Sequence, residues 1–69
     1  MKTLSPTNED RADWANLALD VFRRISRCDT EDMLGDLLCD LMHWAEANDY
    51  DFDAALIRAR GHYEAEVRE

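Results

Sequence analysis

Residues 29–56, DTEDMLGDLLCDLMHWAEANDYDFDAAL, decide the fold class of this 69-residue chain. The stretch combines a strongly amphipathic run with a turn and the start of a second helical pattern. It contains no Lys or Arg but nine acidic residues, which are Asp29, Glu31, Asp32, Asp36, Asp40, Glu46, Asp49, Asp51 and Asp53. This pattern predicts a helix that packs by one apolar face and presents an acidic face to solvent.

The two faces of this helix follow from a rotation of about 100° per residue. The apolar arc contains Leu34, Leu37, Leu38, Leu41 and Ala45, widened by Met33, Met42 and Trp44. The opposite arc contains Asp32, Asp36, Cys39, Asp40, His43 and Glu46. Asn48 is a candidate for the left-handed residue that ends the helix, and Asp51 is a candidate cap of the helix that follows.

A helical period also runs through the flanking segments, so we predict three helices, over residues 6–27, 30–48 and 52–67. Ser5 and Pro6 suit the cap and first position of the first helix, and Asp29 or Thr30 suits the cap of the second. The first helix has an apolar stripe of Trp14, Leu17, Ala18, Val21, Phe22, Ile25 and Cys28. The third has a stripe of Phe52, Ala55, Leu56, Ala59, Tyr63 and Val67.

These patterns predict an all-α protein, a small three-helix bundle forming a single domain over residues 1–69. A chain this short buries only about 60% of its extended surface, so its core is marginal without further support. Apolar side chains also fall off the stripes, namely Leu19, Ile57 and either Met42 or Trp44. We therefore expect a homodimer.

The composition argues against a disulfide-rich, secreted or membrane-spanning protein. Two cysteines are too few for a disulfide framework, the first residues lack the apolar run of a signal peptide, and no stretch approaches the roughly 20 apolar residues that cross a bilayer. We expect a cytoplasmic location with reduced thiols.

The net charge of −8 is unevenly distributed. Residues 1–28 carry five basic and four acidic groups, residues 29–57 carry nine acidic groups alone, and residues 58–69 carry three of each. Such a field repels nucleic acid and anionic membranes and favours basic surfaces or cations. Acidity also serves solubility, and that simpler interpretation stays open.

One face of the predicted second helix carries groups that could do chemistry. Asp36, Cys39, Asp40 and His43 are spaced by three and four residues, and all are metal-ligand types. The alternative is a solvated polar face, which we favour because a second set of ligands is missing. Neighbouring carboxylates disfavour a thiolate at Cys39, and phosphate loops, catalytic triads and paired-cysteine zinc patterns are absent. We expect no catalytic residue and no cofactor, with Asp36, Asp40 and His43 as weak metal candidates.

The run from Asp32 to Tyr63 resembles the C-terminal helical hairpin of the MazG-like all-α nucleoside triphosphate pyrophosphohydrolases. Leu34-Gly35-Asp36, Asp51, Ala55-Leu56 and Tyr63 fit the family pattern, in which a Glu-Leu-Gly-Asp-like segment supplies magnesium-binding carboxylates. The resemblance implies a helical scaffold for nucleotide or divalent-cation binding.

The chain departs from that family at the metal ligands. Met33 stands where the family has a Glu, and the upstream Glu-x-x-Glu is replaced by Asp13-Trp14-Ala15-Asn16. The resemblance therefore implies a relative that has lost catalysis. The segments Leu41–Trp44, Asp51–Asp53 and His62–Glu66 also look like those of a group of short uncharacterised bacterial and phage proteins.

Three functional hypotheses follow. The first is a non-enzymatic interaction module that binds a basic protein surface, such as a mobile-element inhibitor that mimics nucleic-acid charge in the manner of small acidic anti-CRISPR proteins. Its expected partner-binding residues are Asp32, Asp36, Asp40, His43, Glu46, Asp49, Asp51 and Asp53. The second is the degenerate MazG-like nucleotide- or cation-binding protein, and the third is a structural oligomerisation module.

Overall fold

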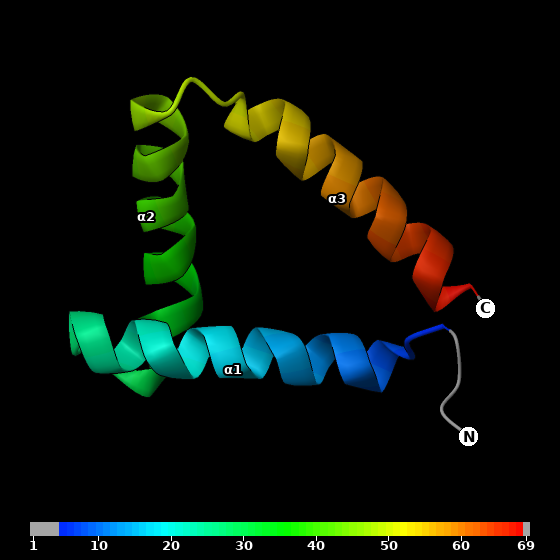
Figure 1. The fold of residues 1–69 in the computed structure, drawn as a ribbon, viewed down its shortest axis with the longest axis horizontal. Coiled ribbons are helices and arrows are strands. Elements are labelled where there is room, and N and C mark those ends of the chain that lie inside the picture. Colours follow the sequence, from blue (N-terminus) through cyan, green and yellow to red (C-terminus); the bar gives the residue numbers. More distant parts are fainter. Residues whose placement is uncertain (1–4, 69) are drawn as a thin grey trace. The chain divides into compact units, whose positions relative to one another are not determined.

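The computed structural model describes residues 5–68 as helices joined by short turns. The elements are α1 (Asn8–Ser26), a 3₁₀ turn η1 (Thr30–Asp32), α2 (Met33–Ala47) and α3 (Phe52–Val67) (Figure 1). All regular structure in this described range is helical, which confirms the predicted all-α class with three helices. Dimerisation and the single domain over residues 1–69 remain predictions.

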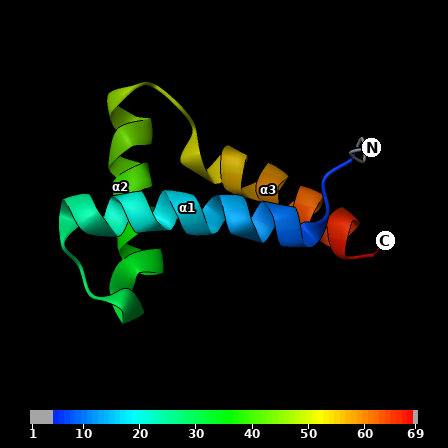
Figure 2. The same cartoon turned by 60° about the horizontal axis from the view of Figure 1, so that its bottom comes forward.

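The chain groups into two compact units that divide between Leu34 and Gly35. The first unit contains α1, η1 and the first two residues of α2. The second contains the remainder of α2, the following turn and α3. Within this second unit, α2 and α3 meet at the turn and diverge from it, as both views show (Figures 1 and 2).

The start of α1 corrects the predicted cap. Thr7, and not Ser5, is the N-cap: its hydroxyl accepts the Asp10 backbone N–H at 3.1 Å, and its own N–H donates to the Asp10 carboxylate at 3.0 Å. This reciprocal capping box satisfies two backbone donors that a cap at Ser5 would leave to water. The helix begins two residues later than predicted for that reason.

The end of α1 is set by Arg27, whose φ of 63° places it in the left-handed region. Its backbone N–H donates to the Arg23 carbonyl at 2.8 Å and closes the last turn. Arg23 and Arg24 lie in that turn, where cations interact favourably with the negative end of the helix dipole.

The predicted helix over residues 30–48 begins with a 3₁₀ turn. Asp29 occupies the cap position, but its side chain makes no capping hydrogen bond. The Asp32 backbone N–H donates to the Asp29 carbonyl at 3.0 Å, and α2 continues from Met33. The acidic stretch is therefore helical from Thr30 to Ala47, in two segments.

The turn after α2 uses a different left-handed residue from the one predicted. Asp49 has a φ of 61°, and the Tyr50 and Asp49 N–H groups donate to the carbonyls of Ala45 at 2.8 Å and Glu46 at 3.4 Å. This is a Schellman arrangement. Asn48 instead donates its side-chain amide to the Trp44 carbonyl at 2.9 Å. Asn48 therefore stabilises the end of the helix through its side chain.

Helix α3 has its predicted bounds and its predicted cap. The Asp51 carboxylate accepts the Ala54 backbone N–H at 3.0 Å, and the Asp51 carbonyl accepts the Ala55 N–H at 3.1 Å. Asp53 lies in the first turn, where a carboxylate also complements the helix dipole.

Burial departs furthest from the prediction. Of the described residues only Ala45 is buried, at 4% exposure. Met33, Leu37 and Phe52 are half-buried, whereas Leu34, Leu38 and Leu41 of the apolar arc of α2 are exposed. The burial expected for that arc is thus wrong for most of its members, because a single α2–α3 turn covers only the end of the arc near Ala45.

Candidate functional site

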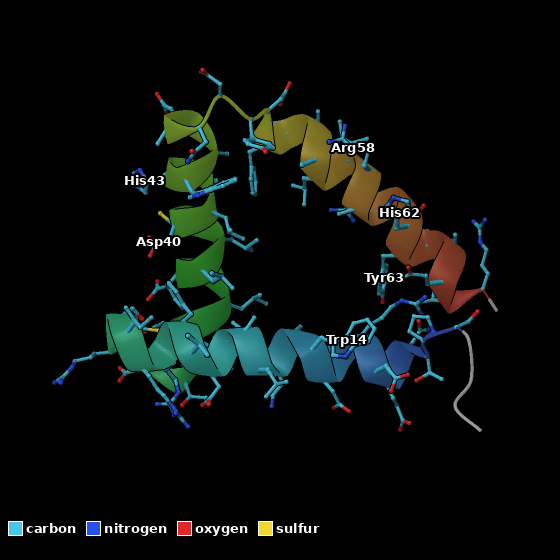
Figure 3. The ribbon with its side chains drawn as sticks, viewed as in Figure 1. Trp14, Asp40, His43, Arg58, His62 and Tyr63 are labelled. Atoms are coloured by element: carbon cyan, nitrogen blue, oxygen red, sulfur yellow. The ribbon has the colours of Figure 1, made fainter. Side chains whose placement is uncertain are left out.

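The acidic face of α2 is a continuous exposed surface on one side of the helix. Asp36, Asp40 and His43 follow each other at spacings of four and three residues, and all three side chains are exposed. Figure 3 shows Asp40 and His43 pointing from the same side of α2. Glu46 extends the face toward the turn. The predicted arrangement of these four residues on one face is confirmed.

The carboxylates of this face lack cationic partners within the described range 5–68. One ion pair in this range joins Arg24 to Asp20 at 3.0 Å, and it lies in α1. Asp36, Asp40 and Glu46 make no ion pair and no side-chain hydrogen bond with any described residue. Their charge is therefore not neutralised within the described part of the chain.

The turn continues the acidic surface with three further carboxylates at two-residue intervals. Asp49, Asp51 and Asp53 are all exposed. Asp51 has two roles here, since its carboxylate also caps α3. The turn is held by the ring contact of Trp44 and Tyr50, whose centroids lie 5.0 Å apart at an interplanar angle of 35°. This contact fixes the backbone from which the carboxylates project.

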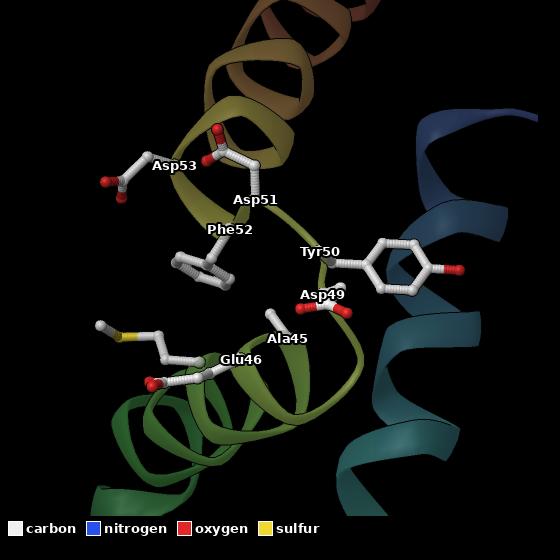
Figure 4. A pocket seen from close by; sticks show the side chains of 8 residues that line it. Ala45, Glu46, Asp49, Tyr50, Asp51, Phe52 and Asp53 are labelled. Carbon is white, nitrogen blue, oxygen red and sulfur yellow. The ribbon is translucent and has the colours of Figure 1, made fainter.

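A shallow hollow lies between the end of α2 and the start of α3. Its lining residues are Met42, Ala45, Glu46, Asp49, Tyr50, Asp51, Phe52 and Asp53 (Figure 4). Phe52 and Ala45 supply an apolar floor, while the carboxylates of Glu46, Asp51 and Asp53 lie at its edge. An apolar floor with an acidic rim fits a long cationic side chain, whose alkyl stem and charged head have opposite preferences.

The structure thus brings together seven of the eight predicted partner-binding residues in the second unit. The eighth, Asp32, is the last residue of η1 and belongs to the first unit. Sequence reasoning assigned Phe52 and Met42 to the core and missed their place in the hollow. Their position immediately beside the acidic turn was the available signal.

The weak metal candidates do not form a metal centre. Among the residues that the structure describes, no group of three His, Cys, Asp or Glu side chains is arranged to hold an ion. Asp36, Asp40 and His43 share a face but are not gathered into such a group. Cys39 is an exposed free cysteine on the same face, and Cys28 is a half-buried one.

Helix α3 presents a mixed surface of basic, acidic and apolar side chains. Arg58 and His62 project from neighbouring turns, as Figure 3 shows. Tyr63, predicted to join the buried stripe, is 64% exposed. A Cβ added at Gly61 would meet nothing within 4 Å, so no close backbone approach explains that glycine among the described residues of its own unit.

Comparison with protein-family models, curated proteins and solved structures finds no match. The likeness to the MazG-like hairpin therefore rests on the sequence pattern alone. In the structure, Met33 begins α2 and Asp36 lies in its first turn, and no group of three His, Cys, Asp or Glu side chains that could hold a magnesium ion is found among the described residues. None of the described helices is long and apolar enough to cross a membrane.

Proposed function

We propose that this protein is a non-enzymatic interaction module whose acidic surface binds a basic surface on another protein. The acidic surface comprises Asp36, Asp40, His43, Glu46, Asp49, Asp51 and Asp53. The observation that carries the proposal is the absence of cationic partners for its α2 carboxylates among the described residues. Carboxylates without partners inside the chain are available to pair with an incoming cation.

The field of this surface supports fast association. Residues 29–57 contribute nine acidic groups and no basic group, so the negative potential is concentrated on one stretch of the chain. Such a field steers a basic partner from beyond contact distance, and salt shortens its reach to about 8 Å at physiological ionic strength.

The hollow beside the turn supports a specific anchor within the broader contact. An Arg or Lys of the partner would lay its alkyl stem over Phe52 and present its charged head to Glu46, Asp51 or Asp53. Arg suits this arrangement better, since its planar guanidinium pairs with carboxylates in a bidentate manner and stacks on aromatic rings.

A more specific proposal concerns the ligand that the basic surface of the partner protein normally binds. Nucleic acid is one ligand of basic protein surfaces, and an acidic helix could compete with its phosphates for such a surface. A small acidic inhibitor encoded by a mobile element would act in this way, as acidic anti-CRISPR proteins do. Displacement of labelled DNA from a captured partner tests this step.

Neutralisation of three carboxylates tests the main proposal. The variant carries Asp36→Asn, Asp40→Asn and Glu46→Gln, and the probe is a fluorescein-labelled nona-arginine peptide, measured by anisotropy over a salt series. Exposed ion pairs contribute about 0.2–1 kcal/mol each, so the loss of three weakens binding by roughly threefold to a hundredfold at low salt. Circular dichroism checks that helicity is retained.

A matched control distinguishes the effect of the position of the carboxylates from the effect of the total charge of the protein. Glu9→Gln, Glu31→Gln and Glu64→Gln remove three exposed carboxylates from outside the acidic surface. This control should bind the peptide nearly as well as the wild type. Equal weakening in both variants would mean that net charge alone attracts the peptide, and the acidic surface would lose its special role.

The nucleotide-binding alternative gives a separate signal. Calorimetry with magnesium, manganese and nucleoside triphosphates should show no heat of binding if the interaction module is the correct function. A saturable heat that is lost in Asp36→Asn would instead support the MazG-like relative.

A further inference from the structure

Helix α1 carries an apolar stripe that no part of its own unit covers. The stripe consists of Trp14, Leu17, Val21 and Ile25, which are 58%, 64%, 55% and 78% exposed. Their spacings of three, four and four residues keep them on one face of the helix over about three turns. A row of large apolar side chains at helical spacing is the sequence pattern of a helix–helix interface.

The first unit packs through the other side of α1. Leu19 is half-buried and lines a small hollow with Thr30 and Met33, where η1 passes into α2. At about 100° per residue, Leu19 lies roughly opposite the middle of the stripe. Leu19, predicted to lie off the packing face, is therefore half-buried together with Phe22 and Cys28, while the four stripe residues Trp14, Leu17, Val21 and Ile25 stay exposed.

The charge of α1 singles out a second copy of the chain as that partner. Residues 8–27, which contain α1 and its C-cap, carry four acidic and four basic groups, so two copies can meet there without the repulsion that the nine acidic groups of residues 29–57 would produce. Its N-terminal end carries Glu9, Asp10 and Asp13 with one basic residue, Arg11, and is acidic on balance. Its C-terminal end carries Arg23, Arg24 and Arg27 with one acidic residue, Asp20, and is basic on balance. Such a helix is complementary to itself when two copies run antiparallel.

We propose that two copies of the chain dimerise through antiparallel contact of their α1 stripes. Asp13 and Arg24 are 11 residues apart, which is close to three helical turns, so they flank the stripe on the same side. A two-fold axis between positions 18 and 19, within about one residue of the middle of the stripe, places Asp13 opposite the second copy's Arg24. The same register places Asp10 opposite the second copy's Arg27. Symmetry produces each of these pairs twice.

Charge reversal with restoration tests the pairing. Sedimentation equilibrium at low salt, over about 1–300 μM of the full chain, gives the dimer dissociation constant for the wild type, Asp13→Arg, Arg24→Asp and the double variant. Each single reversal turns two symmetric attractions into repulsions and should raise the dissociation constant about tenfold. The double variant should return to within about threefold of the wild type.

Recovery of dimerisation in the double variant would have to come from a contact between two chains. Asp13 and Arg24 lie about 16 Å apart along one α1, which is too far for a pair within a chain. The Arg24→Asp change also breaks the pair with Asp20, but reversal of Asp13 in the same chain does not repair that pair. A double variant as weak as the single ones would overturn the proposed register.

Substitution on the stripe tests the apolar contact. Leu17→Gln combined with Val21→Gln should abolish dimerisation over the same concentration range, with helicity followed by circular dichroism. Ile57→Gln on α3 is the matched control, because Ile57 is 73% exposed and lies outside the stripe. A wild-type chain that is monomeric at every concentration overturns the proposal, as does a dimer that the Ile57 change weakens more than the stripe changes. If the stripe variant unfolds, the charge-reversal series still decides the outcome.

Discussion

Asp51 serves both the fold and the acidic surface, and two substitutions separate these roles. Asp51→Ala removes the carboxylate that accepts the Ala54 N–H at 3.0 Å, together with its charge at the start of α3. Asp51→Asn removes the charge but keeps a side-chain oxygen that accepts the same hydrogen bond. The two variants therefore differ in the capping hydrogen bond alone.

The expected magnitudes follow from the exposure of the cap. An exposed N-cap hydrogen bond stabilises its helix by about 1 kcal/mol, and an acidic charge near the helix start adds roughly 0.3–1 kcal/mol at low salt. Asp51→Ala should lower the free energy of unfolding by about 1–2 kcal/mol, whereas Asp51→Asn should lower it by less than about 1 kcal/mol. In a domain of this size, 1 kcal/mol corresponds to a decrease of about 4–8 °C in Tm.

Urea unfolding followed by circular dichroism at 222 nm measures both variants. The protein concentration is held constant because a dimer would make the apparent stability depend on it. Peptide binding by anisotropy gives the complementary ranking: both substitutions remove the same charge, so both should weaken binding of the nona-arginine peptide to a similar extent.

Equal stability of Asp51→Ala and Asp51→Asn would refute the reasoning about the cap. It would show that the 3.0 Å hydrogen bond contributes no more than solvation by water does. Unchanged peptide binding in both variants would remove Asp51 from the acidic surface and leave it as a cap only.

Two further predictions concern the second unit. Gly61→Ala should raise the free energy of unfolding by about 0.5–1 kcal/mol in urea titrations, since Ala has the higher helix propensity and the new Cβ meets nothing within 4 Å; a loss of stability would point to a covering partner at α3. A double-mutant cycle of Trp44→Ala and Tyr50→Ala should give a coupling energy of about 0.5–1.5 kcal/mol, and a value near zero would mean that their ring contact does not hold the turn.

Local features of the second unit could be predicted well from the sequence. The bounds of α3 and its cap at Asp51 agree with the sequence pattern, because an Asp before an amphipathic run satisfies the first backbone donors of the helix. The acidic face with Asp36, Asp40 and His43 on one side of α2 depends only on the helical period.

Two local predictions were wrong, the N-cap of α1 and the left-handed residue after α2, because two nearby residues suit each role. Ser5 and Thr7 are both good caps, and Thr7 prevails because Asp10 completes a reciprocal box three residues later. Asn48 and Asp49 both tolerate the left-handed region. Asp49 adopts it while Asn48 uses its amide on the Trp44 carbonyl, a choice that propensity does not make.

The sequence by itself determined the helical class, the approximate positions of three helices and the concentration of negative charge on one face. These properties depend on period, propensity and composition, which act over a few residues. Which apolar face finds a partner within the chain was decided only by the tertiary structure. Leu19 packs within the first unit while the stripe from Trp14 to Ile25 stays exposed, because packing depends on where the next segment of the chain runs.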